Sequence, residues 1–375
     1  MAADIFITGA TGFLGSRLLA GLLRHTDCRF HLLVRSHCAE DLLTRHLPPA
    51  DLARVCFVRG DITLPRLGLD DGTVASMARS VTEVWHLAAS TNFEESKRDE
   101  TFHVNVEGTR NLLGVVRQFG KLDIFYYMST AYVCGKKLDC VPEGPFDVTE
   151  GFKNPYEESK HVAEKVVRSS GLPVAILRPS ITLGDSQTGD SGGESRMMYG
   201  YALGVLRAAM HAFDSSAAYW DYWRDGHADG GQELKNVNAR LLSSYETLKN
   251  MVTLDDVLAV CVAVRDSGAG VGRTYHIVNP RNISCREIIN VLQRAAKVTG
   301  YVLDPTLTSE SVKGGTVVER AAYRYTKLFW PYATLTEPRW ETCNVDRLSV
   351  QRVPMTENLF EFLIKQFVRY LAPPA

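Results

Sequence analysis

The stretch Asp4-Ile-Phe-Ile-Thr-Gly-Ala-Thr-Gly-Phe-Leu-Gly15 decides the fold of this chain. Its apolar part, Ile5 to Thr8, predicts a short buried strand, and leucines at helical spacing after Gly15 predict a helix. The turn between the two elements carries Gly9 and Gly12. Glycine lets bare backbone approach a ligand, and the unpaired N–H groups at a helix N-terminus attract phosphate. We therefore expect this turn to bind the pyrophosphate of a dinucleotide, although its spacing is G-x-x-G-x-x-G instead of the usual G-x-G-x-x-G.

Composition is that of an ordinary globular protein and excludes several classes. The 375 residues are 45% hydrophobic and 23% charged, with a formal net charge of −1. This charge offers no bulk attraction for nucleic acid or an anionic membrane. The chain has no apolar run of about 18 residues, so we expect no transmembrane anchor. The first strand starts too close to Met1 for a leader, and the eight cysteines include no C-x-x-C pair. These features favour free thiols and a cytoplasmic location.

Five further apolar runs predict strands that alternate with helices. They cover residues 30–34, 54–58, 82–87, 122–128 and 173–178. The alternation predicts an α/β fold with a Rossmann-type, doubly wound parallel sheet in the order 3-2-1-4-5-6. Ligands bind such a sheet where its strands end. The residues with distinctive chemistry follow those ends: Gly9, Arg35, Asp61, Ala88, Thr130 and Pro179.

The residue after the second strand bears on the type of dinucleotide. NAD-binding folds usually place an acidic residue about 20 positions after the glycine turn, where it binds the ribose. This chain has Arg35 there and no carboxylate until Glu40. An arginine suits a ribose 2′-phosphate, so the sequence favours NADP(H). The alternative is a solvated arginine at a strand end.

Tyr156 and Lys160 are the candidate catalytic pair. They lie four residues apart on one face of a helix predicted to begin at Asn154-Pro155. A phenol ionises only near pH 10, and a nearby ammonium favours its ionised form. Thr130, after the fifth strand, adds a second hydroxyl, and two such donors make an oxyanion site for hydride addition to a carbonyl. A tyrosine–lysine pair at this spacing is common on surfaces, but its position after the fifth strand favours catalysis.

The regular alternation ends after residue 180. Residues 185–193 are typical of a polar loop, 197–213 of a helix, and 274–278 of a strand that returns to the sheet. The aromatic run Tyr219 to Trp223 suits either a substrate pocket or core packing. Apolar residues at helical spacing from Leu359 to Leu371 predict a docked closing helix instead of a membrane anchor.

The expected organisation has two parts. An NADP-binding Rossmann domain covers residues 1–184, with 251–280 returning to it. A smaller C-terminal substrate-binding region is formed by residues 185–250 and 281–375. A start at Met1 with no carrier domain before it favours a free-standing protein. The sequence leaves the oligomeric state open.

Together these motifs resemble the extended short-chain dehydrogenase/reductase family. The resemblance rests on Gly9-Ala-Thr-Gly-Phe-Leu-Gly15, Asp61, Ala88-Ala89, Asn105-Val-Glu-Gly108, Ser129-Thr130 and Tyr156-x-x-x-Lys160. Leu32-Leu-Val-Arg35, Gly60-Asp-Ile-Thr63, Met128-Ser-Thr130 and Gly184-Asp-Ser-Gln-Thr-Gly189 look like its thioester reductase branch. That branch includes fatty acyl-CoA reductases and the reductase domains of carboxylic acid reductases and of nonribosomal peptide or polyketide synthases. The match is specific over residues 4–190 and weaker beyond them.

The resemblance implies an activity and a set of residues. The activity is NADPH-dependent reduction of an acyl thioester, on coenzyme A or a phosphopantetheinyl carrier protein, to an aldehyde or, with a second hydride, to an alcohol; the sequence leaves the final product open. The implied catalytic set is Thr130, Tyr156 and Lys160, with Asn105 in the hydrogen-bond relay. The implied cofactor residues are Gly9, Thr11, Gly12, Phe13, Leu14 and Gly15 at the pyrophosphate, Arg35 or Arg45 at the 2′-phosphate, Asp61 and Ile62 at the adenine, and Ala88, Ala89, Asn105, Tyr156, Lys160, Pro179 and Ser180 at the nicotinamide side. No metal and no catalytic cysteine are implied.

Three other functions stay open on the sequence. The nearest is an NADP-dependent reductase of free ketones or aldehydes, similar to dihydroflavonol reductases. A sugar-nucleotide epimerase or dehydratase is less favoured because it suits an acidic residue at the position of Arg35. An NADP-binding sensor without enzymatic activity is also less favoured, because it has no use for Tyr156 and Lys160.

Overall fold

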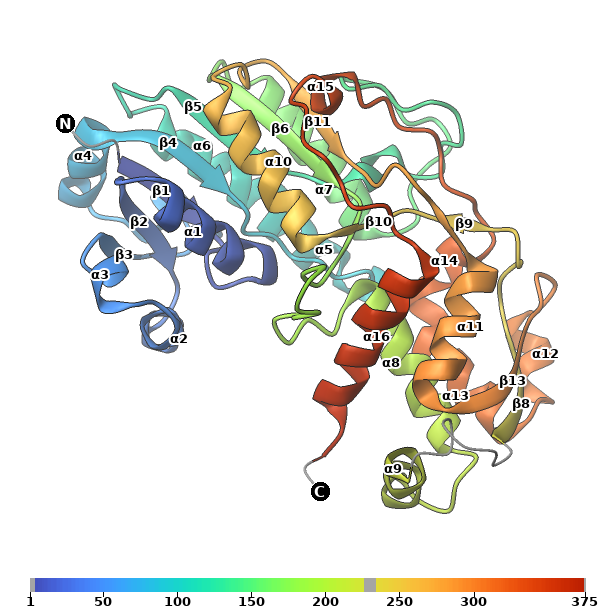
Figure 1. The fold of residues 1–375 in the computed structure, drawn as a ribbon. Coiled ribbons are helices and arrows are strands. Elements are labelled where there is room, and N and C mark those ends of the chain that lie inside the picture. The colour runs from blue at the N-terminus through green and yellow to red at the C-terminus, as the bar shows by residue number, and fades with distance from the viewer. Residues whose placement is uncertain (1–3, 226–233, 374–375) are drawn as a thin grey trace. The chain divides into compact units, whose positions relative to one another are not determined.

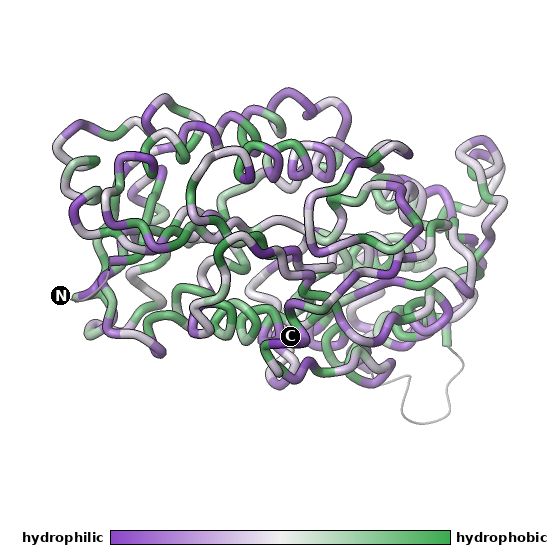
Figure 2. Tube along the Cα trace, turned by 90° about the horizontal axis from the view of Figure 1, so that it is seen from above, coloured by the Kyte–Doolittle hydropathy of each residue, from purple (hydrophilic) through white to green (hydrophobic). Residues whose placement is uncertain are grey.

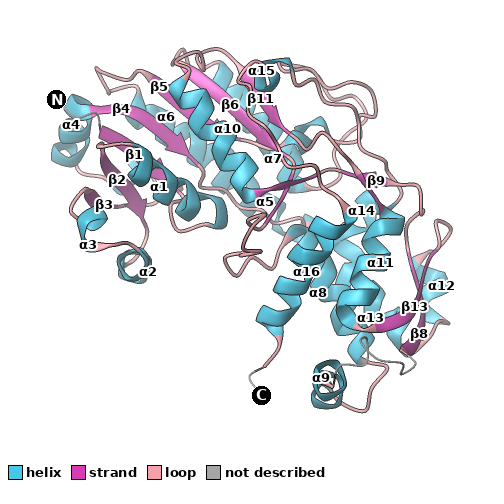
Figure 3. Cartoon of the chain, viewed as in Figure 1, coloured by secondary structure: helices cyan, strands magenta, loops and turns pink. Residues whose placement is uncertain are grey.

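The computed structural model describes residues 4–225 and 234–373, which form two compact units (Figure 1). Unit 1 takes Met1–Ser180, Asp256–Val278 and Pro338–Gln351. Unit 2 takes Ile181–Asp255, Asn279–Glu337 and Arg352–Ala375. Unit 1 contains a parallel sheet with helices on both faces, and unit 2 is mainly helical (Figure 3).

Unit 1 is built on a seven-stranded sheet in the order β11-β6-β5-β4-β1-β2-β3. All its strand pairs are parallel. The predicted fold class and the order 3-2-1-4-5-6 are therefore confirmed, and β11 is the predicted returning strand. The strands are β1 (Asp4–Thr8), β2 (Arg29–Val34), β3 (Val55–Arg59), β4 (Val81–His86), β5 (Ile124–Met128), β6 (Val174–Pro179) and β11 (Thr274–Ile277).

Helices cover both faces of this sheet because successive strand residues point to opposite sides. On one face, α4 (Asp71–Ser80), α6 (Gly108–Val116) and α7 (Pro155–Arg168) share a hydrophobic cluster with the strands. On the other face lie α1 (Phe13–His25) and α10 (Leu254–Asp266) (Figure 1). In β4, Val84 joins the hydrophobic cluster, whereas its neighbour Glu83 binds Arg265 of α10 at 2.8 Å. The inner strands are rich in buried hydrophobic residues such as Ile5, Val84 and Phe125, and Figure 2 colours the described chain by the hydropathy of each residue.

Apolar residues at helical spacing run from about residue 95 to 119, and the structure confirms a continuous helical stretch over residues 95–116, in four consecutive pieces of different helix type. The pieces are η2 (Glu95–Lys97), α5 (Arg98–Phe102), the π-helical segment η3 (His103–Glu107) and α6. At Gly108, where η3 ends, a Cβ would lie 2.9 Å from the side chain of Ile62, so close packing against the chain after β3 shapes this region. Short π-helical segments occur often at functional sites, and this one contains Asn105.

Residues 338–351 belong to unit 1, although the sequence placed them in the substrate-binding region. The N–H of Val141 donates to the Arg339 carbonyl at 2.8 Å, and the N–H of Glu341 donates to the Val141 carbonyl at 2.9 Å. The Trp340 indole donates to the Ala131 carbonyl at 3.2 Å. These bonds join residues about 200 positions apart, so no local pattern in the sequence could predict them. The segment includes α15 (Cys343–Asp346).

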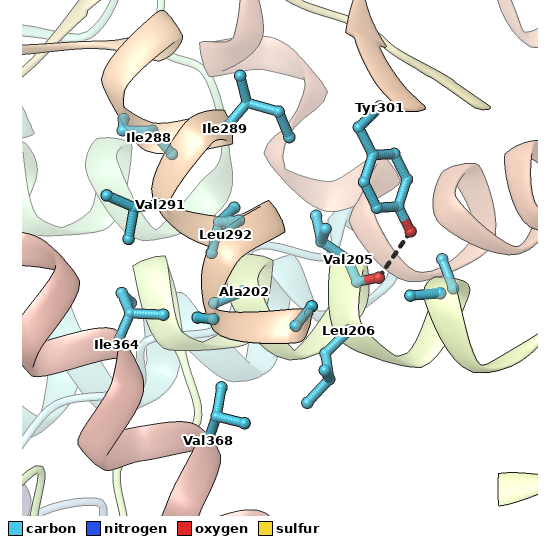
Figure 4. Close-up of a cluster of buried hydrophobic side chains, with 14 of the residues drawn as sticks. Ala202, Val205, Leu206, Ile288, Ile289, Val291, Leu292, Tyr301, Ile364 and Val368 are labelled. Atoms are coloured by element: carbon cyan, nitrogen blue, oxygen red, sulfur yellow. Dashed lines mark hydrogen bonds between the residues drawn. The ribbon is translucent and has the colours of Figure 1, made fainter. Parts of the chain in front are cut away.

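Unit 2 has a hydrophobic core between helices (Figure 4). The core joins apolar faces of α8 (Met197–Met210), α11 (Cys285–Ala296), α13 (Val317–Thr326) and α16 (Glu357–Leu371) with β13 (Val298–Leu303). Tyr301 of β13 donates its hydroxyl to the Val205 carbonyl at 2.8 Å. The predicted closing helix is confirmed as α16, whose Phe360, Leu363 and Phe367 are buried. The other elements of unit 2 are β7 (Ile181–Leu183), α9 (Ser216–Arg224), β8 (Lys235–Leu241), β9 (Leu248–Lys249), β10 (Met251–Thr253), β12 (Ile283–Ser284), α12 (Ser309–Lys313), η5 (Lys327–Phe329) and α14 (Trp330–Ala333).

The aromatic run at residues 219–223 lies in α9 and serves packing. Tyr219, Tyr222 and Trp223 donate hydrogen bonds to the carbonyls of Ala296, Lys297 and Ala295, at 3.0, 2.9 and 2.9 Å. Those carbonyls end α11, where backbone oxygens have no partner inside the helix. Of the two interpretations that the sequence left open, the structure supports core packing.

Candidate active site

The glycine turn between β1 and α1 has the shape that a dinucleotide requires. Gly9 has φ = 78°, and a Cβ there would lie 2.6 Å from the Ala88 nitrogen. Only glycine therefore fits. Gly12 precedes α1 and has no side chain to cap it. The N–H groups in the first turn of α1 are therefore left to bind a ligand. Thr11 and Gly12 are exposed at this turn, whereas Gly15 is buried.

The residues predicted to contact the adenosine part of the cofactor follow β2 and β3. Arg35 follows β2 and is exposed. The first carboxylate after it, Glu40 in α2 (His37–His46), is already bound to Arg59 at 2.5 Å. The side chain of Arg45, the second predicted phosphate ligand, lies outside the described residues. Asp61 closes a turn by accepting from the N–H and hydroxyl of Thr63, both at 2.8 Å.

Small residues lie at the ends of β4 and β6, as the sequence predicted for the nicotinamide side. Ala88 and Ala89 follow β4 and are half-buried. Pro179 ends β6, and Ser180 after it is buried and donates its N–H to the Ile277 carbonyl at 3.1 Å. Phe13 and Leu14 in the first turn of α1 are also half-buried, and Ile62 after β3 is buried. The remaining predicted cofactor residues thus all lie at the carboxyl edge of the sheet.

Thr130 follows β5, with its side chain only weakly engaged. Its hydroxyl oxygen accepts from the Tyr132 N–H at 3.3 Å. The hydroxyl donates to the Pro179 carbonyl at 3.5 Å, which is long for an O–H···O bond. The hydroxyl is therefore oriented by the protein and can still donate to a substrate oxygen.

Helix α7 begins as the sequence predicted and carries the candidate catalytic pair. Asn154 caps it by accepting from the Glu157 N–H at 3.0 Å, and Pro155 takes the first helical position. Tyr156 in the first turn is half-buried, with its ring centroid 5.9 Å from that of Phe93. Lys160 lies one turn further on the same face.

Lys160 is a buried ammonium at the end of β5, only 3% exposed. Its Nζ donates to the Met128 carbonyl at 2.7 Å and lies 4.2 Å from the ring centroid of Tyr127. Burial lowers the pKa of Lys160 to about 7, and the carboxylate of Glu164 opposes that shift. The carbonyl and the ring face both stabilise the charged form. The amine is therefore poised to change its charge near neutral pH.

A buried ion pair that the sequence analysis did not predict lies next to the candidate catalytic residues. Arg178 of β6 binds Glu164 of α7 through Nε at 2.8 Å and through Nη2 at 2.7 Å. Ser129, which directly precedes Thr130, donates its hydroxyl to the same carboxylate at 2.6 Å. Burial raises the pKa of Glu164, but Arg178, Ser129 and Arg168 outweigh it and hold this pKa below its ordinary value. The only signal in the sequence is the spacing, since Glu164 lies one turn beyond Lys160.

Asn105 joins the chain after β4 to helix α7. Its Nδ2 donates to the Ser90 carbonyl and to the Ser159 hydroxyl, both at 2.9 Å, and its Oδ1 accepts from the Ser90 N–H at 2.7 Å. Ser159 in turn donates to the Tyr156 carbonyl at 2.9 Å. Asn105 therefore fixes the turn that carries Tyr156. Its part in a proton relay stays a prediction.

The described residues contain no group of three or more His, Cys, Asp or Glu side chains that could hold a metal ion. None of the helices in the described ranges is both long and apolar enough to cross a membrane.

The sheet order, the glycine turn and the strand-end residues define a dinucleotide-binding protein with the short-chain dehydrogenase/reductase fold. Residues 7–221 match a family of NAD-binding domains described as "Male sterility protein", and the chain belongs to this family.

Several curated proteins are similar to parts of the chain. It is 26% identical to fatty acyl-CoA reductase wat of Drosophila melanogaster over 261 residues, which cover 57% of this chain and 50% of that protein. It is 28% identical to a component of the linear gramicidin synthase of Brevibacillus parabrevis over 320 residues, which cover 78% of this chain and 6% of that protein. It is 30% identical to fatty acyl-CoA reductase 1 of Mus musculus over 221 residues, which cover 48% and 43%. The chain thus matches half or less of the length of these relatives.

Solved structures share the whole fold. The terminal R domain of the myxalamid PKS-NRPS biosynthetic pathway aligns over 100% of this chain and 93% of that one, with a TM-score of 0.77 and 23% identity. A thiolation-reductase di-domain of an archaeal non-ribosomal peptide synthetase gives 0.69 and 17%, covering 99% and 75%. UDP-glucuronic acid 4-epimerase of Bacillus cereus with NAD gives 0.65 and 18%, covering 98% and 97%. At these identities the likeness shows the fold alone.

Proposed function

We propose that this chain is an NADPH-dependent reductase of an acyl thioester carried by coenzyme A or by a phosphopantetheinyl carrier protein. The product is an aldehyde, or an alcohol after a second reduction. The observation that carries the proposal is the placement of Thr130 at the end of β5 and of Tyr156 and Lys160 on α7, with Lys160 bonded to the last residue of β5. The similarity to a fatty acyl-CoA reductase and to a linear gramicidin synthase supports the thioester class.

The residues at the sheet edge fit NADP(H). The space beside Gly9 that a Cβ would fill and the uncapped start of α1 suit a pyrophosphate. Exposed Arg35 suits a 2′-phosphate, and Glu40 is not available for a ribose because Arg59 binds it. When bound, the nicotinamide supplies the hydride.

The side chains of the protein then handle the charge on the substrate oxygen. The hydroxyls of Thr130 and Tyr156 donate to the thioester carbonyl oxygen and stabilise the negative charge that develops there. Tyr156 transfers its proton to that oxygen, and the ammonium of Lys160 lowers the cost of leaving a phenolate behind. The resulting thiohemiacetal expels its thiol and leaves an aldehyde. A second round, with Tyr156 again the proton donor, yields the alcohol.

In the same proposal, unit 2 contributes the acyl-binding surface, as the sequence-derived organisation implies. The nearest competing function uses the same three side chains on a free ketone or aldehyde. The sensor function makes no use of the buried ammonium at Lys160, whose burial costs free energy.

The test is a substrate panel with the full chain. NADPH oxidation is followed with acyl-CoA thioesters of several lengths, the same acyl groups on a carrier protein, and free aldehydes and ketones, and products are identified by mass spectrometry. We expect turnover with a thioester and the release of one thiol for each aldehyde formed. Turnover should be lost in Tyr156→Phe. Turnover with free carbonyl compounds only would establish the dihydroflavonol-reductase-like alternative. NADPH binding without turnover of any compound would establish a sensor.

A further inference from the structure

His86, the last residue of β4, is a buried histidine outside the proposed catalytic set, and it is 2% exposed. Each of its ring nitrogens meets a threonine. Nδ1 lies 2.7 Å from the hydroxyl of Thr8 at the end of β1, and Nε2 lies 3.0 Å from the hydroxyl of Thr109 in α6. The aromatic rings of Phe125 and Tyr127 flank the imidazole, with centroids 6.2 and 5.6 Å away.

The acceptor beyond Thr109 determines the direction of the two hydrogen bonds to the ring nitrogens. The hydroxyl of Thr109 lies 2.6 Å from the backbone carbonyl oxygen of Asn105. A carbonyl oxygen can only accept, so the hydroxyl proton of Thr109 points toward it. Nε2 of His86 must therefore carry a hydrogen and donate it to Thr109. Burial, followed by the charge of Lys160, lowers the pKa of His86 to about 3, so the ring is neutral. Nδ1 consequently accepts from Thr8, whose oxygen in turn accepts from the Ala88 N–H at 3.4 Å.

The two ends of this hydrogen-bonded chain are the two halves of the site. At one end, Thr8 directly precedes Gly9, and Ala88 is the residue against which Gly9 packs. At the other end is Asn105, which the Ser159 hydroxyl connects to the Tyr156 carbonyl. An imidazole is suited to the middle position because it is rigid and donates on one side while it accepts on the other.

We propose that His86 is a positioning residue for the reaction. As the neutral Nε2–H tautomer, it fixes the cofactor turn and the Asn105 segment relative to each other and thereby sets the place of Tyr156. This inference rests on the proposed function for its effect on turnover, but not for the tautomer. A buried histidine that only fills space would show the same burial, so the tests measure the tautomer and the coupling.

The first test reads the tautomer directly and does not depend on any substrate. The full chain is labelled with 15N-histidine, and the imidazole nitrogens are followed by NMR from pH 5 to 9, with His86→Phe used to assign the signals. We expect a protonated Nε2, an unprotonated Nδ1 and no titration over this range. A ring that titrates within the range, or one protonated at Nδ1, overturns the proposal whether or not the protein reduces thioesters.

The second test is a double-variant cycle on turnover with the best substrate of the panel. His86→Phe is expected to lower kcat about tenfold. When added to Asn105→Ala it should lower kcat little further, because both changes interrupt one chain of bonds. The matched control is Tyr275→Phe, which removes the hydrogen bond of another buried side chain of unit 1, to the Ala269 carbonyl, and should combine independently with Asn105→Ala.

A second variant is available if His86→Phe does not fold. If His86→Phe does not fold, Thr109→Val interrupts the same chain at similar volume and takes its place. Independent effects, multiplying within about twofold, overturn the positioning role and leave His86 a core residue. If no compound of the panel turns over, the proposed function fails, and the NMR result alone decides the structural part of the inference.

Discussion

The two units bury different side chains, and this difference indicates where the chemistry lies. The core of unit 2 between α8, α11 and α16 is apolar apart from phenol groups such as that of Tyr301 (Figure 4). Unit 1 instead buries Lys160, Glu164 and Arg178 beside its strand ends. Apolar burial stabilises a fold directly, whereas each buried charge costs several kcal/mol unless it is paired. Unit 2 also buries Lys249 and Glu319, but the cluster in unit 1 contains the proposed catalytic Lys160, and its Glu164 is bonded to Ser129, next to Thr130.

The largest expected difference between the units concerns two phenols. Tyr156→Phe in unit 1 should lower kcat by about 10²–10⁴-fold, the usual contribution of a general acid, with little change in thermal stability. Tyr301→Phe in unit 2 should leave kcat unchanged and cost about 1 kcal/mol of stability, because it removes the bond to Val205. Steady-state kinetics and thermal melts of both variants check this. Parent-like turnover in Tyr156→Phe would contradict the assignment.

The second comparison concerns core stability. Arg178→Met leaves the Glu164 carboxylate buried with Arg168 and Ser129 as its remaining partners, and should cost about 3–5 kcal/mol in urea unfolding. Leu292→Ala in the core of unit 2 should cost about 2–5 kcal/mol through the cavity it leaves. The two losses differ in origin. Adding Glu164→Leu to Arg178→Met should recover much of the first loss, and a double variant as unstable as the sum of its single changes would refute the ion-pair account.

The third prediction concerns pH. Burial lowers the pKa of Lys160 to about 7 in the folded chain, against 10.5 for an ordinary lysine. Between these values the unfolded chain binds more protons at this residue, so its contribution to stability rises with pH from about 7 to about 10.5 and is lost as pH falls. A difference of one in the pKa between the folded and the unfolded chain corresponds to about 1.4 kcal/mol of unfolding free energy. The unfolding free energy of the parent minus that of Lys160→Met should rise over this range, and a flat difference would show an unperturbed amine.

The smallest expected effect concerns Arg35, an exposed charge of unit 1. It should bind the 2′-phosphate of NADPH and contribute little to the stability of the fold. Arg35→Asp should raise the Kd of NADPH about tenfold or more, leave that of NADH nearly unchanged, and not alter the melting temperature. The matched control is Arg29→Asp, another exposed arginine, at the opposite end of β2. Fluorescence titration measures both cofactors. Equal loss in the two variants would remove Arg35 from the 2′-phosphate site.

Local patterns predicted most of the architecture because each relied on interactions within a few residues. The cap at Asn154, the glycine at position 9 and the alternation of strands and helices are of this kind. The helix through residue 105 formed as the periodicity predicts, but its π-helical turn could not be predicted, because the packing of Gly108 on Ile62 and the bonds of Asn105 to Ser90 are not encoded in helical periodicity.

The sequence by itself determined the fold class, the strand order and the candidate residues Thr130, Tyr156 and Lys160. It could do so because turn chemistry and hydrophobic period act along the chain. Only the tertiary structure decided what holds those residues in place. Arg178 on Glu164, His86 between two threonines and Trp340 on Ala131 are contacts between distant segments. These residues become neighbours only when the strands and helices pack together, and the low dielectric of the buried environment then strengthens their polar contacts.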